Sequence, residues 1–548
     1  MTYKLNAGKE NNAMKTLFRN GRIYDGTGAD GFVGDILVED DRILEVAPHI
    51  DCEDAETVDL TGLSVSAGFF DGHSHNDFFA IKKEPLKYFE PFIRQGITSF
   101  VAGNCGMSAF GFEPDTPHLD RIGAGLFGYK GDTTGVYPDA ASFFNAVDGH
   151  MPCNLAALVG HCTARASVSG YENRKLTEDE NRRMLALMEQ ALKEGACGAS
   201  LGLMYEPGLY AQSEELRGVA LLCDKYDVPM TVHPRAESKV SMAYPQLLGR
   251  PHILRALDEL AEIGRGTKLK LQYSHCIFVG RSSLKLKDDA LAIMRKMRED
   301  GMDVRFDIYN ETLGTSVITV ILPDWYRALT PDQKKSPVNK LKLQVLCSAS
   351  IALLGFGWKD ILVAYAGQGN ERYEGKTIDQ IAKETKQSCL DAYIEVCEAS
   401  EFKGRVNMGP YSTPEIIHEF EKSDLCNFFM TDAWVEEYGI QNPAIYDCHP
   451  KFLRDAVTGE GASMPVTIRK MTGAVADRFG VKDRGYLKPG CHADLTVFDE
   501  EKVRQAVPDQ EKSFGIEQVY INGRRVLKDG VLDTGALRTS GRAIRVMH

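Results

Sequence analysis

Between residues 63 and 434 the chain alternates short apolar runs with longer segments of helical periodicity, such as TEDENRRMLALMEQALKEG. This alternation is typical of βαβ units built around a parallel sheet. Eight apolar runs turn polar at their C-terminal ends: LSVSAGFFDGHSH, ITSFVAGNCG, NLAALVGHCT, ACGASLGLMY, VPMTVHPRAE, KLKLQYSHC, MDVRFDIYNE and LCNFFMTDAW. Eight such units predict an α/β fold organised as a (β/α)8 TIM-type barrel.

Both ends of the chain have a different pattern. Residues 16–60 read as short strands joined by turns, with Asn20-Gly21 as a hairpin signal. A similar β-rich pattern returns near the C-terminus around Asn522-Gly523. We therefore expect one small β-sandwich made from residues 1–64 and 481–548, with the barrel at 65–480.

The spacing of the polar strand ends predicts an insertion. Most consecutive ends lie about one strand and one helix apart, whereas Asp307 and Asp432 are 125 residues apart. Residues from about 320 to 412 therefore form an expected insertion after the seventh strand. At the catalytic face of a barrel, a long insertion is often a lid or a substrate wall.

Composition narrows the class of partner. The net charge is −13 and the pI is about 5.6, which argues against nucleic acid or an anionic membrane, because both require clustered Lys and Arg. A small-molecule substrate is expected instead, and a homo-oligomer is left open. The first residues are polar and no apolar run approaches 18 residues, so we expect a cytoplasmic protein. The 13 cysteines are scattered and odd in number, which predicts reduced thiols.

Polar residues at the strand ends are candidates for metal binding and catalysis. In a barrel every strand delivers its last residues to the same face, so side chains far apart in sequence are expected to converge. The converging set comprises His75, Cys105, His161, His233, His275, Asp307 and Asp432.

Two of these strand ends suggest metal ligands. His73 and His75 are two residues apart, which places both imidazoles on the same side of an extended chain. A pair of surface or capping histidines is the alternative, but this pair ends an apolar strand. Cys105 lies between Gly103-Asn104 and Gly106, and a thiolate is a strong zinc ligand. A buried structural cysteine and a nucleophile are the alternatives for Cys105.

His233 and His275 each follow a β-rich run and complete the metal prediction. Either could be a core histidine, but one Cys with two His is a known set of three zinc ligands that leaves a fourth position for water. Asp432 emerges from a strongly apolar run, which is costly unless the carboxylate meets a metal, a donor or a proton. A helix N-cap is its alternative role. We favour a general base that takes a proton from zinc-activated water and passes it to the leaving nitrogen.

These residues resemble the amidohydrolase superfamily and, within it, the N-acyl-D-amino-acid deacylase (D-aminoacylase) family. The resemblance covers nearly the whole chain. The cysteine of GNCG is its diagnostic element, because many other amidohydrolases carry a carboxylated lysine there. The matching stretches are GFFDGHSHND, QGITSFVAGNCG, LVGHCTAR, GASLGLMYEPGLYA, TVHPRAES, SHCIFVGR and MTGAVADRFGVKDRGYLKPGCHADLTVFD.

The resemblance implies a barrel with a split β-sandwich and hydrolysis of an N-acyl amide to a carboxylate and an amine. It implies one tight Zn²⁺ and a weaker second divalent metal, with Asp432 both as a metal ligand and as acid and base. Tyr205 matches a family active-site tyrosine and is the candidate for polarising the carbonyl, with simple packing as the alternative. The implied zinc ligands are Cys105, His233 and His275, and the second site uses His73 and His75.

The match weakens at substrate recognition. Where the family carries a lysine, a tyrosine and an arginine that hold the substrate carboxylate, this chain has Ile277, Glu311 and Lys451. Lys451 keeps a positive charge but cannot form the two parallel hydrogen bonds that an arginine guanidinium makes with a carboxylate. Other side chains expected near the substrate are His161, Arg235, Arg281 and Arg454.

We therefore expect zinc-dependent hydrolysis of an N-acyl-D-amino acid or a related linear amide. The first alternative is an amidohydrolase that acts on a cyclic amide, a modified peptide or another neutral amide. The second is a non-catalytic binding protein that kept the barrel.

Overall fold

The computed structural model describes residues 14–123, 132–241, 243–244, 249–327, 329–507 and 513–548. The polar segment at residues 1–13 lies outside these ranges. All 13 cysteines lie within them, and each is a free thiol.

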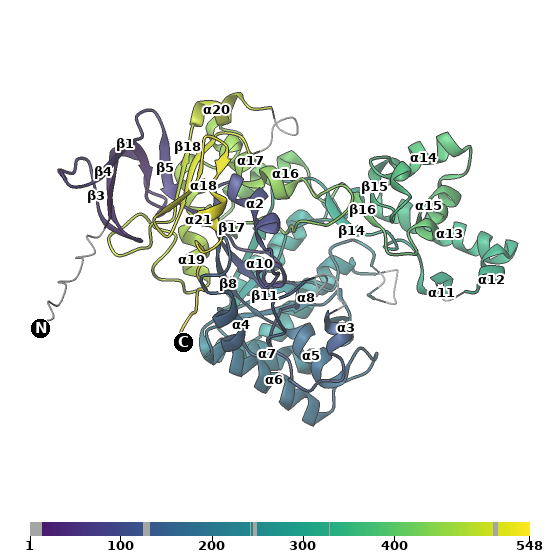
Figure 1. The fold of residues 1–548 in the computed structure, drawn as a ribbon. Helices are drawn as coiled ribbons and strands as arrows, with labels where there is room; N and C mark the ends of the chain where they lie inside the picture. Colours follow the sequence, from purple (N-terminus) through teal and green to yellow (C-terminus); the bar gives the residue numbers. More distant parts are fainter. Residues whose placement is uncertain (1–13, 124–131, 242, 245–248, 328, 508–512) are drawn as a thin grey trace, which may run out of the picture.

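One nine-stranded sheet is built from both ends of the chain (Figure 1). Its two halves join where β5 pairs antiparallel with β18, with Ala67 opposite Leu495. Apolar side chains from both halves form one core, which includes Ile23, Val65 and Val497. The strands are β1 (Lys15–Tyr24), β2 (Phe32–Glu39), β3 (Arg42–Ala47), β4 (Glu56–Asp59), β5 (Ser64–Ala67), β18 (Leu495–Phe498), β19 (Ile516–Ile521), β20 (Arg524–Lys528) and β21 (Val531–Leu532).

Only one of the two Asn-Gly pairs predicted to form hairpin turns does so. Asn522-Gly523 forms the tight turn between β19 and β20, as predicted. The hairpin prediction at Asn20-Gly21 was wrong, because both residues lie inside β1 where the register with β2 shifts. Asn20 has a φ of 62°, so the left-handed backbone that favours Asn serves a β-bulge here instead of a turn.

The centre of the molecule is α/β with parallel strands, and each of the eight predicted runs contains a strand. One sheet has the order β6-β7-β8, and a second has the order β9-β10-β11-β12-β13-β17. A single residue separates β8 from β9, so the third predicted run contributes to both sheets. The strands are β6 (Phe69–Asp71), β7 (Ile97–Ala102), β8 (Asn154–Ala157), β9 (Val159–Gly160), β10 (Ala199–Gly202), β11 (Pro229–His233), β12 (Lys270–Tyr273), β13 (Asp303–Ile308) and β17 (Cys426–Phe429).

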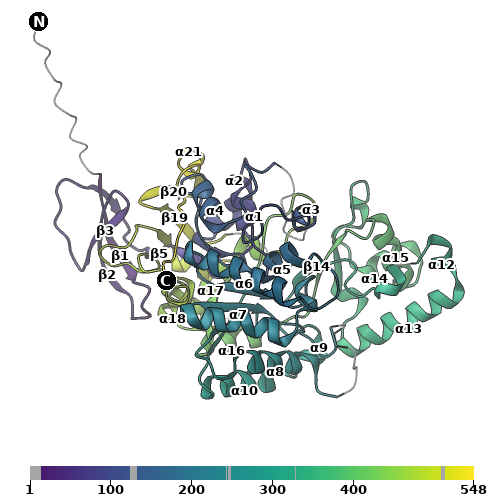
Figure 2. The same ribbon diagram turned by 90° about the horizontal axis from the view of Figure 1, so that it is seen from below.

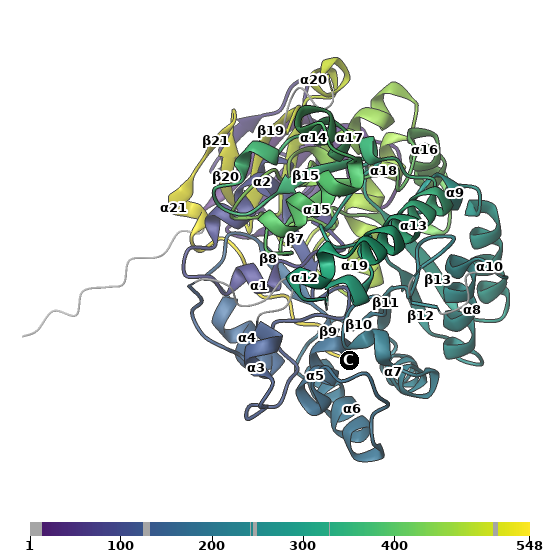
Figure 3. The same ribbon diagram turned by 90° about the vertical axis from the view of Figure 1, so that its right-hand side faces the viewer.

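Helices follow the parallel strands and lie outside them (Figures 2 and 3). In α6 (Glu178–Lys193), a capping box between Thr177 and Glu180 begins the helix, and Met184, Met188 and Leu192 form its buried face. Similar amphipathic helices are α7 (Ser213–Tyr226), α8 (His252–Gly264), α10 (Lys287–Glu299), α16 (Pro414–Lys422) and α17 (Ala444–Thr458). By contrast, α5 (His161–Ser169) is buried along its whole length. Among the residues with described positions, no helix has the length and apolar character needed to cross a membrane.

A separate lobe lies between β13 and β17, at the opposite end of the molecule from β1–β3 (Figure 2). It has a three-stranded antiparallel sheet in the order β14-β16-β15, covered by helices. The lobe begins at Gly314, a little before the predicted boundary at about 320. Its main elements are β14 (Gly314–Val317), α13 (Pro337–Leu354), β15 (Ile361–Tyr365), α14 (Ile378–Thr385), α15 (Cys389–Ala399) and β16 (Arg405–Met408).

Candidate metal centre and active site

Cys105 is shared by two groups of side chains at the C-terminal ends of the parallel strands. The first group is Cys105, His233 and His275, and the second is His73, His75, Cys105 and Asp432. Within each group the candidate ligand atoms all lie within 4.8 Å of one another. Five of the seven strand-end residues predicted to converge therefore belong to these groups, together with His73.

The first group has the geometry of a single-ion site. Cys105 Sγ lies 3.7 Å from His233 Nδ1 and 3.8 Å from His275 Nε2. Two ligands bound at zinc distances of about 2.0–2.3 Å in a tetrahedron lie about 3.3–3.8 Å apart. One thiolate and two imidazoles are also donors that zinc prefers. The residues present therefore fit a zinc ion.

The second group brings the histidine pair and Asp432 to the same thiol. His73 Nε2 lies 3.4 Å from Cys105 Sγ, and Asp432 Oδ1 lies 3.5 Å from His73 Nε2 and 3.4 Å from His75 Nε2. The histidines are fully buried, whereas the Asp432 side chain is 23% exposed. Asp432 is therefore the carboxylate of this group that can meet a ligand from solvent.

Three of these residues have left-handed backbones. Cys105 has a φ of 52°, His275 of 36° and Asp432 of 47°. Residues other than glycine rarely adopt such angles, and each costs on the order of 1–3 kcal/mol. Gly106 follows Cys105 with a φ of 76°, and a Cβ there would lie 2.5 Å from the backbone nitrogen of Gly202. Sharp turns after the strands thus aim these side chains toward one another.

Electrostatics favour the charge states that a metal needs. Burial opposes ionisation of the Cys105 thiol, but His73, His233 and His275 outweigh it and bring the thiol pKa well below its usual value. Burial likewise opposes ionisation of Asp432, and His73, His75 and His275 lower its pKa overall. A thiolate and a carboxylate are therefore both favoured in this site.

Glu237 supports the first group from outside and was missed from the sequence. Its Oε1 lies 2.6 Å from His275 Nδ1, and its Oε2 lies 3.7 Å from His233 Nε2. A carboxylate on the outer nitrogen of a metal-binding histidine fixes its tautomer and orientation. The available signal was its place four residues after His233 in TVHPRAES.

Replacing Glu237 by Gln is expected to weaken zinc binding about 10- to 100-fold while leaving the fold intact, because the amide cannot hold two imidazoles as strongly. Competition with a chelator would measure the zinc affinity, and Glu259→Gln, next to Arg235, is a matched control. An unchanged affinity would show that Glu237 does not orient the two histidines.

Asp307 lies between the two groups. Its carboxylate accepts from the His275 backbone nitrogen at 2.7 Å and from Gln272 Nε2 at 2.9 Å, and it lies 3.6 Å from His73 Nδ1. The sequence predicted that Asp307 converges with the candidate ligands. In the structure Asp307 lies beside them and holds the His275 backbone in place.

Three tyrosines lie near the two groups of candidate metal ligands. The Tyr205 hydroxyl lies 3.5 Å from His233 Nδ1, and its ring packs on the His233 ring at 4.7 Å. Burial, with the negative charges of Cys105 and Asp432, raises the Tyr205 pKa well above its usual value. Burial also raises the pKa values of Tyr309 and Tyr411, two tyrosines that the sequence did not single out. These hydroxyls therefore keep their protons and can donate hydrogen bonds.

The predicted substrate residues Lys451 and Glu311 are joined to each other. Lys451 Nζ lies 2.7 Å from Glu311 Oε1 and 3.6 Å from Asp447 Oδ2. The Ile277 side chain is buried. The positive charge of Lys451 is therefore already matched by two carboxylates.

The other predicted substrate residues contact acids of their own instead of the metal groups. His161 Nε2 lies 2.8 Å from Glu215, and Arg235 forms a double contact with Glu259 and bonds the Leu209 and Ala211 carbonyls. In the same way Arg281 pairs with Asp360 at 2.6 Å, and Arg454 lies 3.6 Å from Glu460.

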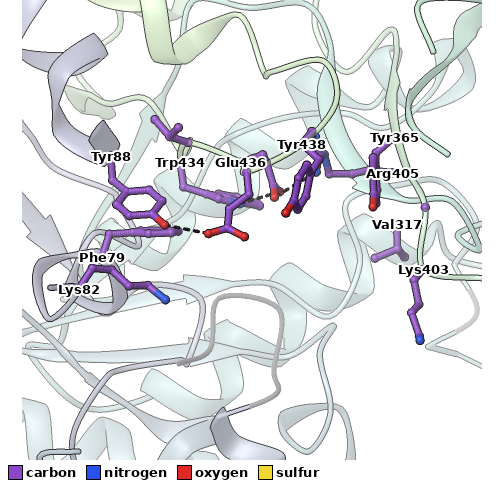
Figure 4. Close-up of a pocket in the computed structure, with 13 residues that line it drawn as sticks. Phe79, Lys82, Tyr88, Val317, Tyr365, Lys403, Arg405, Trp434, Glu436 and Tyr438 are labelled. Atoms are coloured by element: carbon purple, nitrogen blue, oxygen red, sulfur yellow. Dashed lines mark hydrogen bonds and ion pairs between the residues drawn. The ribbon is translucent and has the colours of Figure 1, made fainter. Parts of the chain in front are cut away.

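A cavity of about 280 Å³ lies next to the second group, between the inserted lobe and the segments that follow β6 and β17 (Figure 4). Trp434 lines it and meets the His75 ring edge-on, with the ring centres 5.7 Å apart. The sequence did not predict this cavity, because part of its wall comes from the inserted lobe, whose position cannot be read from residue spacing. The lining residues are Phe79, Lys82, Tyr88, Val317, Tyr365, Lys403, Gly404, Arg405, Trp434, Val435, Glu436, Glu437 and Tyr438.

A third group of titratable side chains is formed by His418, Glu421 and Asp455. Burial and the neighbouring Asp455 raise the pKa of Glu421 to about 9. The folded protein thus binds a proton at Glu421 that the unfolded chain loses above its usual pKa of 4.5. This contribution to stability is complete below about pH 4.5 and is lost as the pH rises towards about 9.

Replacing Glu421 by Gln is therefore expected to flatten the decline in the free energy of unfolding between about pH 5 and 9, by at most about 1.4 kcal/mol per pH unit. Urea unfolding at several pH values would measure the slope. Glu419→Gln, at an exposed position of the same helix, is the control. Equal slopes in the variant and the unmodified protein would rule out this role for Glu421.

Two characterised bacterial enzymes match this chain along almost its whole length. No protein-family model matches it. The D-aminoacylase of Alcaligenes xylosoxydans xylosoxydans is 26% identical over 526 residues, covering 94% of both chains. The N-acyl-D-glutamate deacylase of the same organism is 27% identical over 525 residues, covering 92% of both.

The chain resembles D-aminoacylases of the amidohydrolase superfamily along almost its whole length. A D-aminoacylase structure, described for the functional role of its binuclear metal centre, superposes with a TM-score of 0.73 at 25% identity and covers 97% of this chain and 99% of its own. The family resemblance inferred from the sequence is therefore confirmed. In this chain the predicted metal-ligand residues lie together. Two of the three residues at the predicted substrate-carboxylate positions, Lys451 and Glu311, are paired with each other.

Proposed function

We propose that this chain is a zinc-dependent hydrolase that cleaves the amide bond of an N-acyl-D-amino acid or a closely related linear amide. The convergence of Cys105, His233 and His275 beside the partly exposed Asp432 carries the proposal. Full-length similarity to a D-aminoacylase and an N-acyl-D-glutamate deacylase supports it.

The proposal includes the architecture. We propose that the eight parallel strands close into a (β/α)8 barrel at residues 65–480, flanked by a β-sandwich from 1–64 and 481–548. Contacts between the end of β17 and the end of β6 support closure. The Thr431 backbone and hydroxyl donate to Asp71, and the Asp432 backbone nitrogen donates to the His73 carbonyl at 3.2 Å.

Two metal sites of unequal strength are proposed. Cys105, His233 and His275 would hold the tight zinc, and His73 and His75 would hold a weaker second ion, with Asp432 beside this histidine pair. A bound zinc ion supplies a Lewis acid that polarises a carbonyl and makes water a nucleophile near neutral pH. The binuclear centre named for the related D-aminoacylase supports a two-ion arrangement.

The side chains of this protein supply the proton transfers. Asp432 has a lowered pKa and partial exposure, so its carboxylate can accept a proton from water and then donate it to the leaving nitrogen. Tyr205 keeps its proton and can donate a hydrogen bond to the amide oxygen as negative charge develops there.

Substrate recognition favours a second candidate, an amide without a free carboxylate. Lys451, the remaining cation at the positions where the family binds a carboxylate, is matched by Glu311 and Asp447. A carboxylate substrate would have to compete with these two acids. Ile277, Arg235 and His161 stay proposed substrate residues, and the last two would need to leave their acidic partners to contact a substrate.

A turnover screen tests the function and ranks the two candidates. It would compare N-acyl-D-amino acids, their L-forms, the same compounds with the carboxylate converted to an amide, dipeptides and cyclic amides. Preference for the D-acids supports the first candidate, and preference for the carboxamides or cyclic amides the second. Zinc below about a tenth of an equivalent, together with no turnover of any compound, would reject the enzyme hypothesis.

A further inference from the structure

Aromatic rings from three parts of the chain face the cavity beside the metal groups (Figure 4). Phe79 and Tyr88, in the segment after His75, have ring centres 4.9 Å apart. Tyr365 of the inserted lobe stacks on Tyr438, with centres 6.1 Å apart and planes inclined by 21°. Trp434 contributes a further ring to the lining. The cavity thus offers ring faces and edges from five aromatic side chains.

The charged groups in the lining have partners. Arg405 lies 3.0 Å from Glu436, which also accepts from the Trp434 indole nitrogen at 2.8 Å. Glu437 accepts from the Tyr88 hydroxyl at 3.1 Å. Lys403 lies 3.2 Å from Glu401, and Lys82 is engaged as well. An ionic substituent would compete with these contacts, whereas an aromatic ring gains from stacking and edge contacts without breaking them.

The cavity is placed to receive part of a substrate held at the metal groups. Trp434 follows Asp432 by two residues, and its ring meets that of His75. A volume of about 280 Å³ lies just below the usual range of about 300–1,000 Å³ for ligand pockets, which suits one substituent better than a whole ligand. The Tyr438 side chain is 52% exposed, so the cavity keeps an open side.

We propose that this cavity is a specificity subsite for an aromatic substituent of the amide substrate. This inference rests on the proposed amidohydrolase function and adds the chemical class of one part of the substrate. It also gives the inserted lobe a role, because Tyr365 reaches the cavity from the lobe and Tyr438 stacks on it.

Matched substrate series would test the subsite with zinc-loaded protein. One series exchanges a methyl for a benzyl group on the acyl side, and the other on the amine side. The unmodified protein is expected to favour the benzyl member of one series by about tenfold or more in kcat/KM. Tyr438→Ala and Tyr365→Leu should reduce that preference about fivefold or more, with the methyl substrate within about twofold.

Phe32→Ala, at an exposed aromatic position on β2, is the matched control and should keep the full preference. The proposal fails if the unmodified protein shows no benzyl preference in either series. It also fails if the cavity variants lower the methyl and benzyl substrates equally, because that result indicates general damage to the active site.

A binding measurement separates this inference from the proposed function. The chain has three tryptophans, so the Trp325→Phe, Trp358→Phe double variant reports on Trp434 alone. Benzyl methyl ketone, which has no amide bond to cleave, should change the Trp434 fluorescence saturably, and acetone should not. Adding Tyr438→Ala should abolish the change. Saturable binding without any amide turnover would reject the proposed function but support the aromatic subsite. If no saturable binding is observed, the subsite is rejected.

Discussion

Replacing Asp432 by Asn should lower kcat about a thousandfold or more and leave the tight metal bound. Asn has nearly the same shape as Asp but cannot accept a proton at neutral pH. The three side chains proposed to hold the tight zinc are unchanged in this variant. Metal analysis of the purified variant together with steady-state kinetics would measure both effects.

Asp424→Asn is the matched control for this prediction, since Asp424 is an exposed aspartate just before β17. It should keep both zinc and turnover. If Asp432→Asn lost its zinc along with its activity, Asp432 would be a ligand of the tight ion. If it retained most of its turnover, the general base would have to be another group.

Replacing His275 by Ala is expected to remove both zinc and turnover. The change deletes one of three proposed ligands and leaves Glu237 without its closest partner, 2.6 Å away. The zinc content should fall from about one equivalent to below about a tenth, with kcat below detection. Metal analysis and kinetics measure this, and circular dichroism checks that the variant is folded.

His49→Ala provides the comparison, because His49 is an exposed histidine near the end of β3. Its zinc content and activity should not change. A folded His275→Ala variant that carried a full equivalent of zinc would move the tight site to the group containing His73 and His75.

The fold class and the metal groups could be predicted because both depend on regular patterns. Alternating apolar runs and amphipathic helices indicated parallel strands, and parallel strands bring their last residues to one face. Cys105, His233 and His275 could therefore be grouped before any coordinates, although 170 residues separate the first from the last. Their role as metal ligands stays a prediction, as does the role of Asp432.

Other contacts depend on turns and packing that no periodicity encodes. Glu237 reaches His275 only because the chain bends after β11, and Lys451 reaches Glu311 across 140 residues. Asn20-Gly21 has the composition of a hairpin, yet its pairing with β2 continues through a bulge. The aromatic cavity needs an inserted lobe whose position relative to Trp434 cannot be read from spacing.

The left-handed backbones at Cys105, His275 and Asp432 have an evolutionary consequence. Glycine adopts such angles without strain, so a mutation to glycine at any of these positions would relieve local strain while deleting a side chain proposed to act at the metal site. A laboratory selection that rewards thermal stability alone could therefore enrich variants that fold well and hydrolyse nothing. Directed evolution of this protein should screen for turnover in every round.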